Sequence, residues 1–345
     1  MLNISTAGLA RISHCILLGK GMLNMNRRNF LWLSAGTLAS AIVVTPVLAG
    51  AGLDRFRAPE WGLGRKFLLN RYGRIAYIDA GRGDAALFLH GYPLSGFQWR
   101  QAVEQLGPFY RCIVPDFMGL GATEAATDQD LGAVAQMGML ISLLDALHID
   151  RVHIVANDSG GAVAQLLVAH HPERVRTLLL TNCDTERQSP PPAMRLVIEL
   201  ARRRLYVKQW IEPWYENRDH ARGADQFGGM CYADPANPTD EAIEMYFGPI
   251  LSSPTRAAQA EAHAIAQGAN ALSEIGPALA RSPVPTRIVW GVADRIFDPG
   301  NADFLDRAFG NSRGVRRLET GKLFWPEERP DVIADEAHAL WRNAA

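Results

Sequence analysis

The sequence has few cysteines and almost no net charge. Its four cysteines, Cys15, Cys112, Cys183 and Cys231, show no Cys-x-x-Cys or Cys/His spacing, so they indicate neither a metal site nor a disulfide framework. Lysine and arginine number 35 against 36 acidic residues, which leaves a formal net charge of −1. Nucleic-acid binding needs a basic surface, so the balance argues against a nucleic-acid partner and favours a small molecule.

Internal repeats and low-complexity tracts are also missing. With 345 residues and 48% hydrophobic composition, the chain is long enough for one large globular domain or for a core with an insertion. Single cores stop growing at about 250 to 300 residues, so we expect one core that carries additional chain.

The first 49 residues have the pattern of an export signal. An arginine pair, Arg27-Arg28, follows Met25, and an uncharged run from Phe30 to Leu53 comes next, with small residues near Ala49. This pattern resembles a twin-arginine signal, so residues 1–49 predict export to the periplasm, with Met25 as an alternative start. The alternative is an uncleaved membrane anchor, because the run is long enough to cross a bilayer of about 30 Å. Otherwise we expect no stable membrane association.

Short apolar runs alternate with segments of helical length after the signal. Two runs on either side of Tyr72-Gly73 predict a hairpin. Five further runs suit strands buried on both faces, at residues 85–89, 112–114, 152–156, 177–180 and 287–290. A helical stripe between Leu131 and Leu147 predicts a helix that packs on the sheet, through Val134, Met137, Leu140, Ile141, Leu144 and Leu147. The pattern predicts a mostly parallel sheet flanked by helices.

The strand pattern stops between Asp184 and about Arg281. Three prolines, 190 to 192, open this stretch, and aromatic residues such as Trp210 and Trp214 are frequent in it. We expect a mostly helical insertion, a lid over the sheet. The predicted organisation is a core in two parts, residues 50–185 and 282–345, with the helical lid at residues 186–281.

The segment from Val152 to Ala162 has the form of a nucleophile elbow, a sharp turn between a strand and a helix. The residue at the apex takes a strained conformation, so the positions two before and two after it must be small. Ala156 and Gly160 flank Asp158 in this way, whereas Ser159 would have Asn157 as a flank. The pattern therefore favours Asp158 as the nucleophile. A simple helix cap is the alternative reading.

Two further motifs follow other predicted strands. In His90-Gly91-Tyr92-Pro93 the glycine allows a sharp turn, so the backbone N–H groups of Tyr92 and Ser159 could form an oxyanion hole. Asp294 comes shortly after the run that ends at Trp290, where an acid could orient a catalytic histidine. Alternatively Asp294 caps the next turn.

In their order, these motifs resemble the Asp-nucleophile branch of the α/β-hydrolase superfamily, the haloalkane dehalogenases and epoxide hydrolases. The similarity runs from about Arg65 to the carboxyl end and includes Asp-x-x-Gly-x-Gly at residues 116–121. It implies an α/β-hydrolase fold, no cofactor or metal, and attack by Asp158 on a small organic substrate to give a covalent ester. Asp294 would pair with a histidine that activates water, and Tyr92 and Ser159 would supply the oxyanion donors.

The chain departs from the family pattern at the histidine. Aligning Glu328-Arg329-Pro330 with the family's Glu-x-Pro places Leu323 where the catalytic histidine belongs. His263, in the lid, and His338, on a terminal helix, fit structural or surface roles better than a catalytic one. An ionised aspartate attacks carbon without a base, but hydrolysis of the ester needs an activated water, so turnover is expected to be slow or to use another base.

The substrate class stays open at the level of sequence. Ser159 occupies the position at which dehalogenases commonly have a halide-binding tryptophan. Epoxide hydrolases donate from lid tyrosines, for which the sequence offers four candidates, Tyr206, Tyr215, Tyr232 and Tyr246. Two alternatives remain: a serine-type esterase that uses Ser159, and a ligand-binding or sensor protein that kept the fold without turnover.

Overall fold

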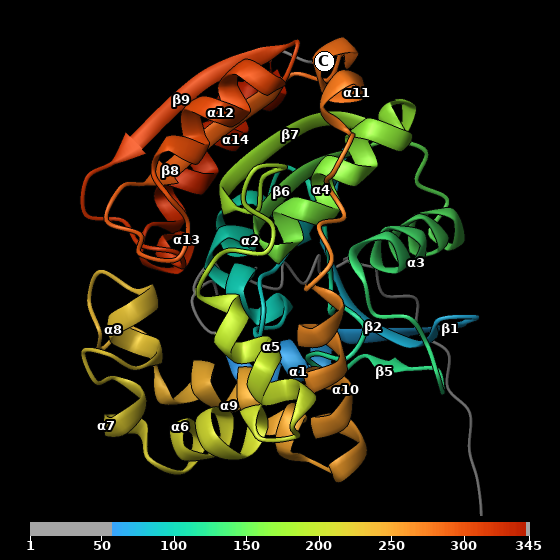
Figure 1. The fold of residues 1–345 in the computed structure, drawn as a ribbon. Helices are drawn as coiled ribbons and strands as arrows, with labels where there is room; N and C mark the ends of the chain where they lie inside the picture. The colour runs from blue at the N-terminus through green and yellow to red at the C-terminus, as the bar shows by residue number, and fades with distance from the viewer. Residues whose placement is uncertain (1–56, 343–345) are drawn as a thin grey trace, which may run out of the picture. The chain divides into compact units, whose positions relative to one another are not determined.

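A computed structural model describes residues 57–342 of the chain (Figure 1). The predicted export signal at residues 1–49 lies outside this range. Within the described residues, no helix combines the length and the apolar character needed to cross a membrane.

One mixed sheet organises residues 57–342 (Figure 1). Its order is β1-β2-β4-β3-β6-β7-β8-β9, and β5 pairs with β2 outside this path. β1, β2 and β4 are antiparallel neighbours, and the pairs from β4 through β3 to β9 are parallel. The strands are β1 (Arg65–Asn70), β2 (Gly73–Gly81), β3 (Ala85–Leu89), β4 (Arg111–Pro115), β5 (Glu124–Ala125), β6 (Val152–Asp158), β7 (Val175–Cys183), β8 (Thr286–Gly291) and β9 (Ser312–Leu318). The predicted mostly parallel sheet is confirmed.

The burial of the central strands explains why the sequence alone predicts them. Every residue of β6 is buried, and β3 and β4 are buried except at their first residues. Strands covered on both faces are continuous apolar runs, the pattern that the sequence displays. The predicted hairpin is β1–β2, and Gly73 opens β2 with φ 123°, where the backbone of β5 leaves no room for a side chain.

Two groups of helices pack on the sheet. α4 contacts β6, β7 and α3, and α14 contacts β7 and α2. The core helices are α1 (Ala58–Gly64), η1 (Gly96–Trp99), α2 (Arg100–Leu106), α3 (Ala133–Ala146), α4 (Ser159–His170), η2 (Pro172–Arg174), α12 (Gly300–Ala308), α13 (Trp325–Glu328) and α14 (Pro330–Arg342).

The stripe predicted for α3 was partly wrong. Val134 is 56% exposed and Ile141 is only half-buried. The buried positions of α3 include Met139 and Leu143 in addition to the predicted Met137, Leu140 and Leu144. The buried face is thus wider and rotated relative to the prediction.

The chain between β7 and β8 is built of helices and loops, with one isolated bridge between Thr185 and Gln188. We call it the lid. α5 packs against α10, and α9 packs against α6, α10 and η1 (Figure 1). The lid helices are α5 (Met194–Arg202), η3 (Val207–Ile211), α6 (Glu212–Glu216), α7 (Arg218–Ala221), α8 (Phe227–Cys231), α9 (Asp240–Leu251), α10 (Pro254–Ala266) and α11 (Gly276–Arg281).

β9 was missed because it lacks an apolar run. It reads Ser-Arg-Gly-Val-Arg-Arg-Leu, and none of its residues is fully buried. It forms the edge of the sheet beside β8. Charged residues are usual on edge strands, where they prevent pairing with other chains.

A buried ion pair between two core helices also holds a lid residue. Arg100, at the start of α2, donates from Nη1 to Glu327 Oε2 at 2.7 Å, and their side chains are 9% and 1% exposed. The hydroxyl of the lid residue Tyr232 donates to Glu327 Oε1 at 2.6 Å. Arg100 also donates to the carbonyl of Phe97, so the buried guanidinium has hydrogen-bond partners in place of water.

We expect Glu327→Ala to lower the free energy of unfolding by about 3–5 kcal/mol, because it leaves the Arg100 charge buried without its partner. The measurement is urea denaturation at neutral pH. The control is Glu124→Ala, which breaks an exposed pair with Arg74 whose side chains are 59% and 44% exposed. That change should cost less than about 1 kcal/mol. Equal costs for the two variants would contradict the importance of the buried pair.

Candidate active site

Asp158 lies at the sharp turn between β6 and α4. Its φ is 52° and its ψ −133°, a left-handed conformation that is unusual for a residue with a side chain. A Cβ at Gly160 would lie 2.6 Å from the carbonyl oxygen of His90 and 2.7 Å from that of Leu89. The end of β3 therefore passes so close to the turn that only glycine fits two residues after Asp158. Such strained residues cluster at functional sites.

The loop after β3 holds the carboxylate of Asp158. The backbone N–H of Tyr92 donates to Asp158 Oδ2 at 3.0 Å, and the backbone N–H of Ser159 also donates to this carboxylate. A Cβ at Gly91 would lie 2.5 Å from Oδ2, so the loop could not approach with a larger residue there. The two predicted oxyanion donors thus converge on one carboxylate.

A buried amide relay fixes the loop against the elbow. Gln98 accepts from the backbone N–H of Gly91 at 3.1 Å and donates to Asn157 Oδ1 at 2.7 Å. Asn157 donates in turn to the carbonyl oxygens of Asn182 and Leu323, each at 3.0 Å. From the sequence, Asn157 was a poor flank for Ser159; in the structure its side chain ties η1, β7 and the loop at Leu323 together.

Burial and neighbouring charges act against ionisation of Asp158. Burial raises the pKa of Asp158 well above its usual range, and repulsion from Asp184 and Asp294 adds to the rise. The N–H groups of Tyr92 and Ser159 lower the pKa because they stabilise the charged form. The carboxylate therefore depends on these two donors for its negative charge.

Asp158 faces a cavity of about 100 Å³ between the sheet and the lid. Most of the walls are apolar or aromatic, and no histidine is among the described residues that form them. The core contributes Tyr92, Pro93, Asp158, Ile296, Leu323 and Phe324, and the lid contributes Pro191, Ala193, Met194, Val197, Tyr206, Trp210, Trp214, Phe227, Met230 and Cys231. Such a cavity suits a small apolar group beside a carboxylate.

Leu323 lies in this cavity wall, at the position where the family pattern has histidine. Its side chain is buried, and its carbonyl accepts the hydrogen bond from Asn157. The main chain of the loop is thus held in place while an apolar side chain faces the cavity.

Asp294 follows β8 and is buried in a polar network. It accepts from Asn182 Nδ2 and from the backbone N–H of Ile296, both at 2.8 Å. Burial raises the pKa of Asp294 to about 6, and these hydrogen bonds oppose the rise. No histidine contacts Asp294 within residues 57–342, so the predicted pairing has no partner in that range.

Asn182 was missed by the sequence analysis. It also exchanges hydrogen bonds with the backbone of Gly291 and accepts from Trp325 Nε1. An amide side chain shortly after the apolar run of β7, near the carboxyl end of the strand, was the available signal.

The two histidines considered from the sequence lie away from the cavity. His263 is buried, with Nδ1 2.9 Å from the carbonyl oxygen of Met118, and its ring stacks on Tyr92. Burial lowers the pKa of His263 to about 4. His338, on α14, packs against Phe109 and Tyr110. These contacts agree with the structural or surface roles that the sequence favours for both histidines.

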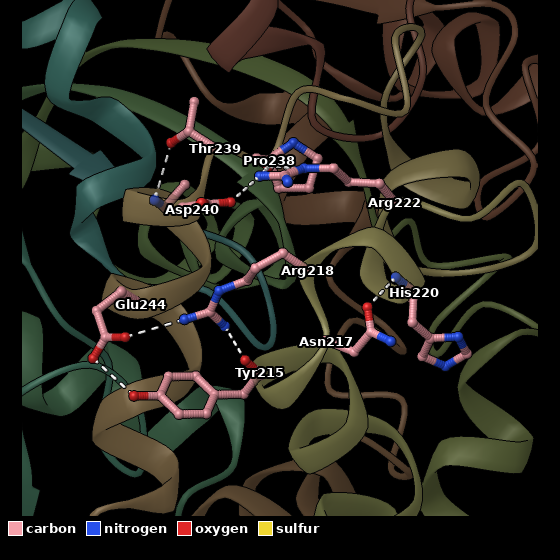
Figure 2. Close-up of polar contacts among 10 residues, drawn as sticks. Tyr215, Asn217, Arg218, His220, Arg222, Pro238, Thr239, Asp240 and Glu244 are labelled. Atoms are coloured by element: carbon pink, nitrogen blue, oxygen red, sulfur yellow. Dashed lines mark hydrogen bonds and ion pairs between the residues drawn. The ribbon is translucent and has the colours of Figure 1, made fainter.

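Of the four lid tyrosines, Tyr206 alone lines the cavity. Tyr215 donates to Glu244 at 3.0 Å in a polar cluster of the lid with Arg218, as Figure 2 shows. Tyr232 binds Glu327, and Tyr246 is buried against Phe97. The fold therefore separates residues that the sequence could not distinguish.

Three of the four cysteines lie in the described range. Cys112, Cys183 and Cys231 are free and buried. Residues 57–342 contain no group of three or more histidine, cysteine or acidic side chains arranged to hold a metal ion.

Residues 85–327 match the family described as alpha/beta hydrolase fold. The chain belongs to this family. Haloalkane dehalogenase 2 of Mycobacterium tuberculosis is 25% identical to this α/β hydrolase over 292 residues, 76% of this chain and 89% of that protein. Cis-3-alkyl-4-alkyloxetan-2-one decarboxylase of Shewanella oneidensis is 26% identical over 247 residues, 68% and 74% of the two chains. The predicted similarity to the dehalogenase type is confirmed.

A solved structure shares the fold of this α/β hydrolase. The epoxide hydrolase CorEH superposes with a TM-score of 0.66 at 20% identity, covering 81% of this chain and 99% of that one. This similarity shows that the two proteins share the α/β-hydrolase fold.

We expect Gly160→Ala to destabilise the α/β hydrolase by about 1–3 kcal/mol, because its Cβ would push against the backbone at the end of β3. The matched control is Gly62→Ala in α1, where a Cβ would meet nothing within 4 Å. Alanine there should be neutral or stabilising by up to about 1 kcal/mol. Urea denaturation of both variants measures the difference, and a neutral Gly160→Ala would contradict the close approach.

Proposed function

We propose that this α/β hydrolase attacks a small alkyl electrophile, an epoxide or a haloalkane, with the carboxylate of Asp158 and forms a covalent ester. The observation that carries the proposal is the position of Asp158: its carboxylate is held by two backbone N–H groups and faces an apolar cavity. The twin-arginine pattern of residues 1–49 supports a separate proposal, that the protein acts in the periplasm.

The first step needs no base. A carboxylate oxygen of Asp158 bonds to the substrate carbon while the bond from that carbon to halide or to epoxide oxygen breaks. The apolar walls strip water from the carboxylate and position the alkyl chain, which favours displacement. The remaining carboxylate oxygen becomes the ester carbonyl, for which the N–H groups of Tyr92 and Ser159 are suitable donors.

Among the two substrate classes, the cavity favours epoxides. Epoxide opening leaves an alkoxide that needs a proton, and Tyr206 and Tyr92 both line the cavity. The hydroxyl of Tyr92 already donates to the carbonyl of Ala260 at 3.2 Å, so Tyr206 is the candidate proton donor. Halide release needs N–H donors, and of the two indoles in the wall, Trp210 and Trp214, that of Trp214 already donates to Gln226 at 2.9 Å. The similarity to an oxetanone decarboxylase is a further argument for strained rings, because that relative's substrate also contains one.

The serine-esterase alternative has weaker support. Ser159 does not line the cavity that contains Asp158, and its Oγ has no hydrogen-bond partner among the described residues. A serine nucleophile needs a base that accepts its proton through a hydrogen bond, and no described residue makes a hydrogen bond with Ser159 Oγ. Leu323 keeps the second alternative, ligand capture without turnover, open to experiment.

The test of the nucleophile uses short probes, 1,2-epoxybutane and 1-bromobutane, because the cavity encloses about 100 Å³. We expect intact mass to show one alkyl adduct that maps to Asp158, and no adduct on Asp158→Ala. Ser159→Ala is the matched control and should still form it, since only its backbone N–H contacts the carboxylate. Loss of the adduct in Ser159→Ala alone, or labelling of Ser159 by a fluorophosphonate, would favour the serine esterase.

A second test restores the family's base. We expect Leu323→His to speed hydrolysis of the ester by about 10²-fold, because general-base assistance contributes about 10²- to 10⁴-fold. The measurement is decay of the adduct by mass spectrometry after excess probe is removed. Leu323→Gln is the control, since it is polar but cannot act as a base. Equal decay rates for the two variants would show that position 323 does not face the ester.

A further inference from the structure

A second cavity, of about 30 Å³, borders the elbow at Ser159. Unlike the Asp158 cavity, it has several polar walls, contributed by Gln136, Ser159, Asp184, Ser189, His263 and Gln267. We call it the Ser159 cavity. A cavity needs about 10–15 Å³ to hold one water, so this one has room for a water molecule.

Two polar atoms of these walls have no partner. Ser159 Oγ and Gln267 Nε2 are buried and make no hydrogen bond with any described residue. Buried polar atoms are nearly always hydrogen-bonded, so each exception needs an explanation. A hydroxyl that donates and accepts, an amide that donates and the Asp184 carboxylate that accepts together match the hydrogen bonds of one water.

Asp184 comes to this cavity from the strand beside the elbow. Cys183, the last residue of β7, pairs with Asp158 in the register of β6 and β7. The next residue, Asp184, therefore leaves the sheet next to the nucleophile. In agreement, Asp184 exerts a stronger repulsion on Asp158 than Asp294 does.

We propose that the Ser159 cavity holds the hydrolytic water and that Asp184 is the base that activates it, in place of the histidine replaced by Leu323. The inference rests on the proposed function, because it concerns the second half of the same reaction. It adds a catalytic residue that lies outside the family motifs quoted above.

The step balances in protons and electrons. Asp184 takes one proton from the water as its oxygen bonds to Cγ of the Asp158 ester, and negative charge moves to the ester carbonyl oxygen. Collapse of this intermediate breaks the bond between Cγ and the ester oxygen, and the leaving alkoxide takes the proton from Asp184. The products are an alcohol and Asp158 as a free carboxylic acid, which contains one oxygen and the second proton of the water. Loss of that proton, to the phenolate that epoxide opening leaves or to solvent, restores the carboxylate.

The charges around Asp184 favour its ionisation at the stage that needs a base. Burial raises the pKa of Asp184 to about 7, and a hydrogen bond with Ser189 opposes the rise. Repulsion between Asp158 and Asp184 disfavours two ionised carboxylates at once. Ester formation makes Asp158 neutral, so this repulsion is absent at the stage when Asp184 must accept a proton.

The other groups near Asp184 are weaker bases or stay neutral. His263 lines the same cavity, but with a pKa of about 4 it accepts a proton poorly at neutral pH. Burial raises the pKa of the Cys183 thiol well above its usual range, so this thiol is uncharged. Asp294 also repels Asp158, and its carboxylate accepts a hydrogen bond from Asn182.

The experiment compares the full-length protein with Asp184→Asn, using 1,2-epoxybutane and rapid-quench intact mass. We expect the Asp158 ester to accumulate in Asp184→Asn and its hydrolysis to slow by at least about 10²-fold. Ester formation should continue, and the acid limb of its pH profile should move to lower pH. This shift follows because loss of the Asp184 charge lowers the pKa of Asp158, so more carboxylate is ionised at a given acidic pH. A purely structural role would not produce these opposite effects.

Two further variants keep the test decisive. Glu186→Gln removes a carboxylate two residues away, one that accepts from the backbone N–H of Glu274, and should leave both steps unchanged. Gln267→Leu replaces a water partner by an apolar side chain and should slow hydrolysis by about tenfold without affecting ester formation. If Asp184→Asn does not fold, Gln267→Leu still tests whether the water of the Ser159 cavity takes part in hydrolysis.

Isotope labelling identifies the atom that water attacks. A single turnover in H₂¹⁸O should place one ¹⁸O in the Asp158 peptide. Normal ester decay in both Asp184→Asn and Gln267→Leu, or absence of label from Asp158, would overturn the inference while the adduct itself still supports the proposed function. Absence of any Asp158 adduct in all of these proteins would overturn both.

Discussion

The close approach between the end of β3 and the turn at Asp158 is the constraint on which the site depends. Gly160 lies against the carbonyl groups of Leu89 and His90, and Gly91 lies against the carboxylate. These contacts bring the Tyr92 N–H within 3.0 Å of Asp158 Oδ2. The strain of a left-handed φ is tolerated because packing and the Gln98–Asn157 relay hold both segments.

Enclosure by the lid gives the carboxylates their unusual environment. Burial is the largest cause of the raised pKa values of Asp158, Asp184 and Asp294. In such surroundings each charge is sensitive to its neighbours, because water does not screen them. The same enclosure creates two different cavities around one turn, an apolar one at Asp158 and a polar one at Ser159.

The sequence predicted the strands that are buried on both faces of the sheet. The runs that became β3, β4, β6, β7 and β8 are apolar on both faces, so their pattern does not depend on tertiary context. β9 was missed and the buried face of α3 was misplaced, because an edge strand carries charge and Val134 is exposed at an apolar position. Local pattern cannot distinguish an apolar residue in the core from one on the surface.

For the site, the sequence by itself determined the turn at Asp158, the adjoining loop at Tyr92 and the leucine at position 323, because these depend on residue size and order along the chain. The tertiary structure decided which distant side chains meet there. It placed Tyr206 in the cavity and Tyr215 and Tyr232 elsewhere, joined Asn182 to Asp294, and brought Asp184 beside the elbow. Such meetings depend on strand register and on lid packing, which are set by contacts between segments far apart in the sequence.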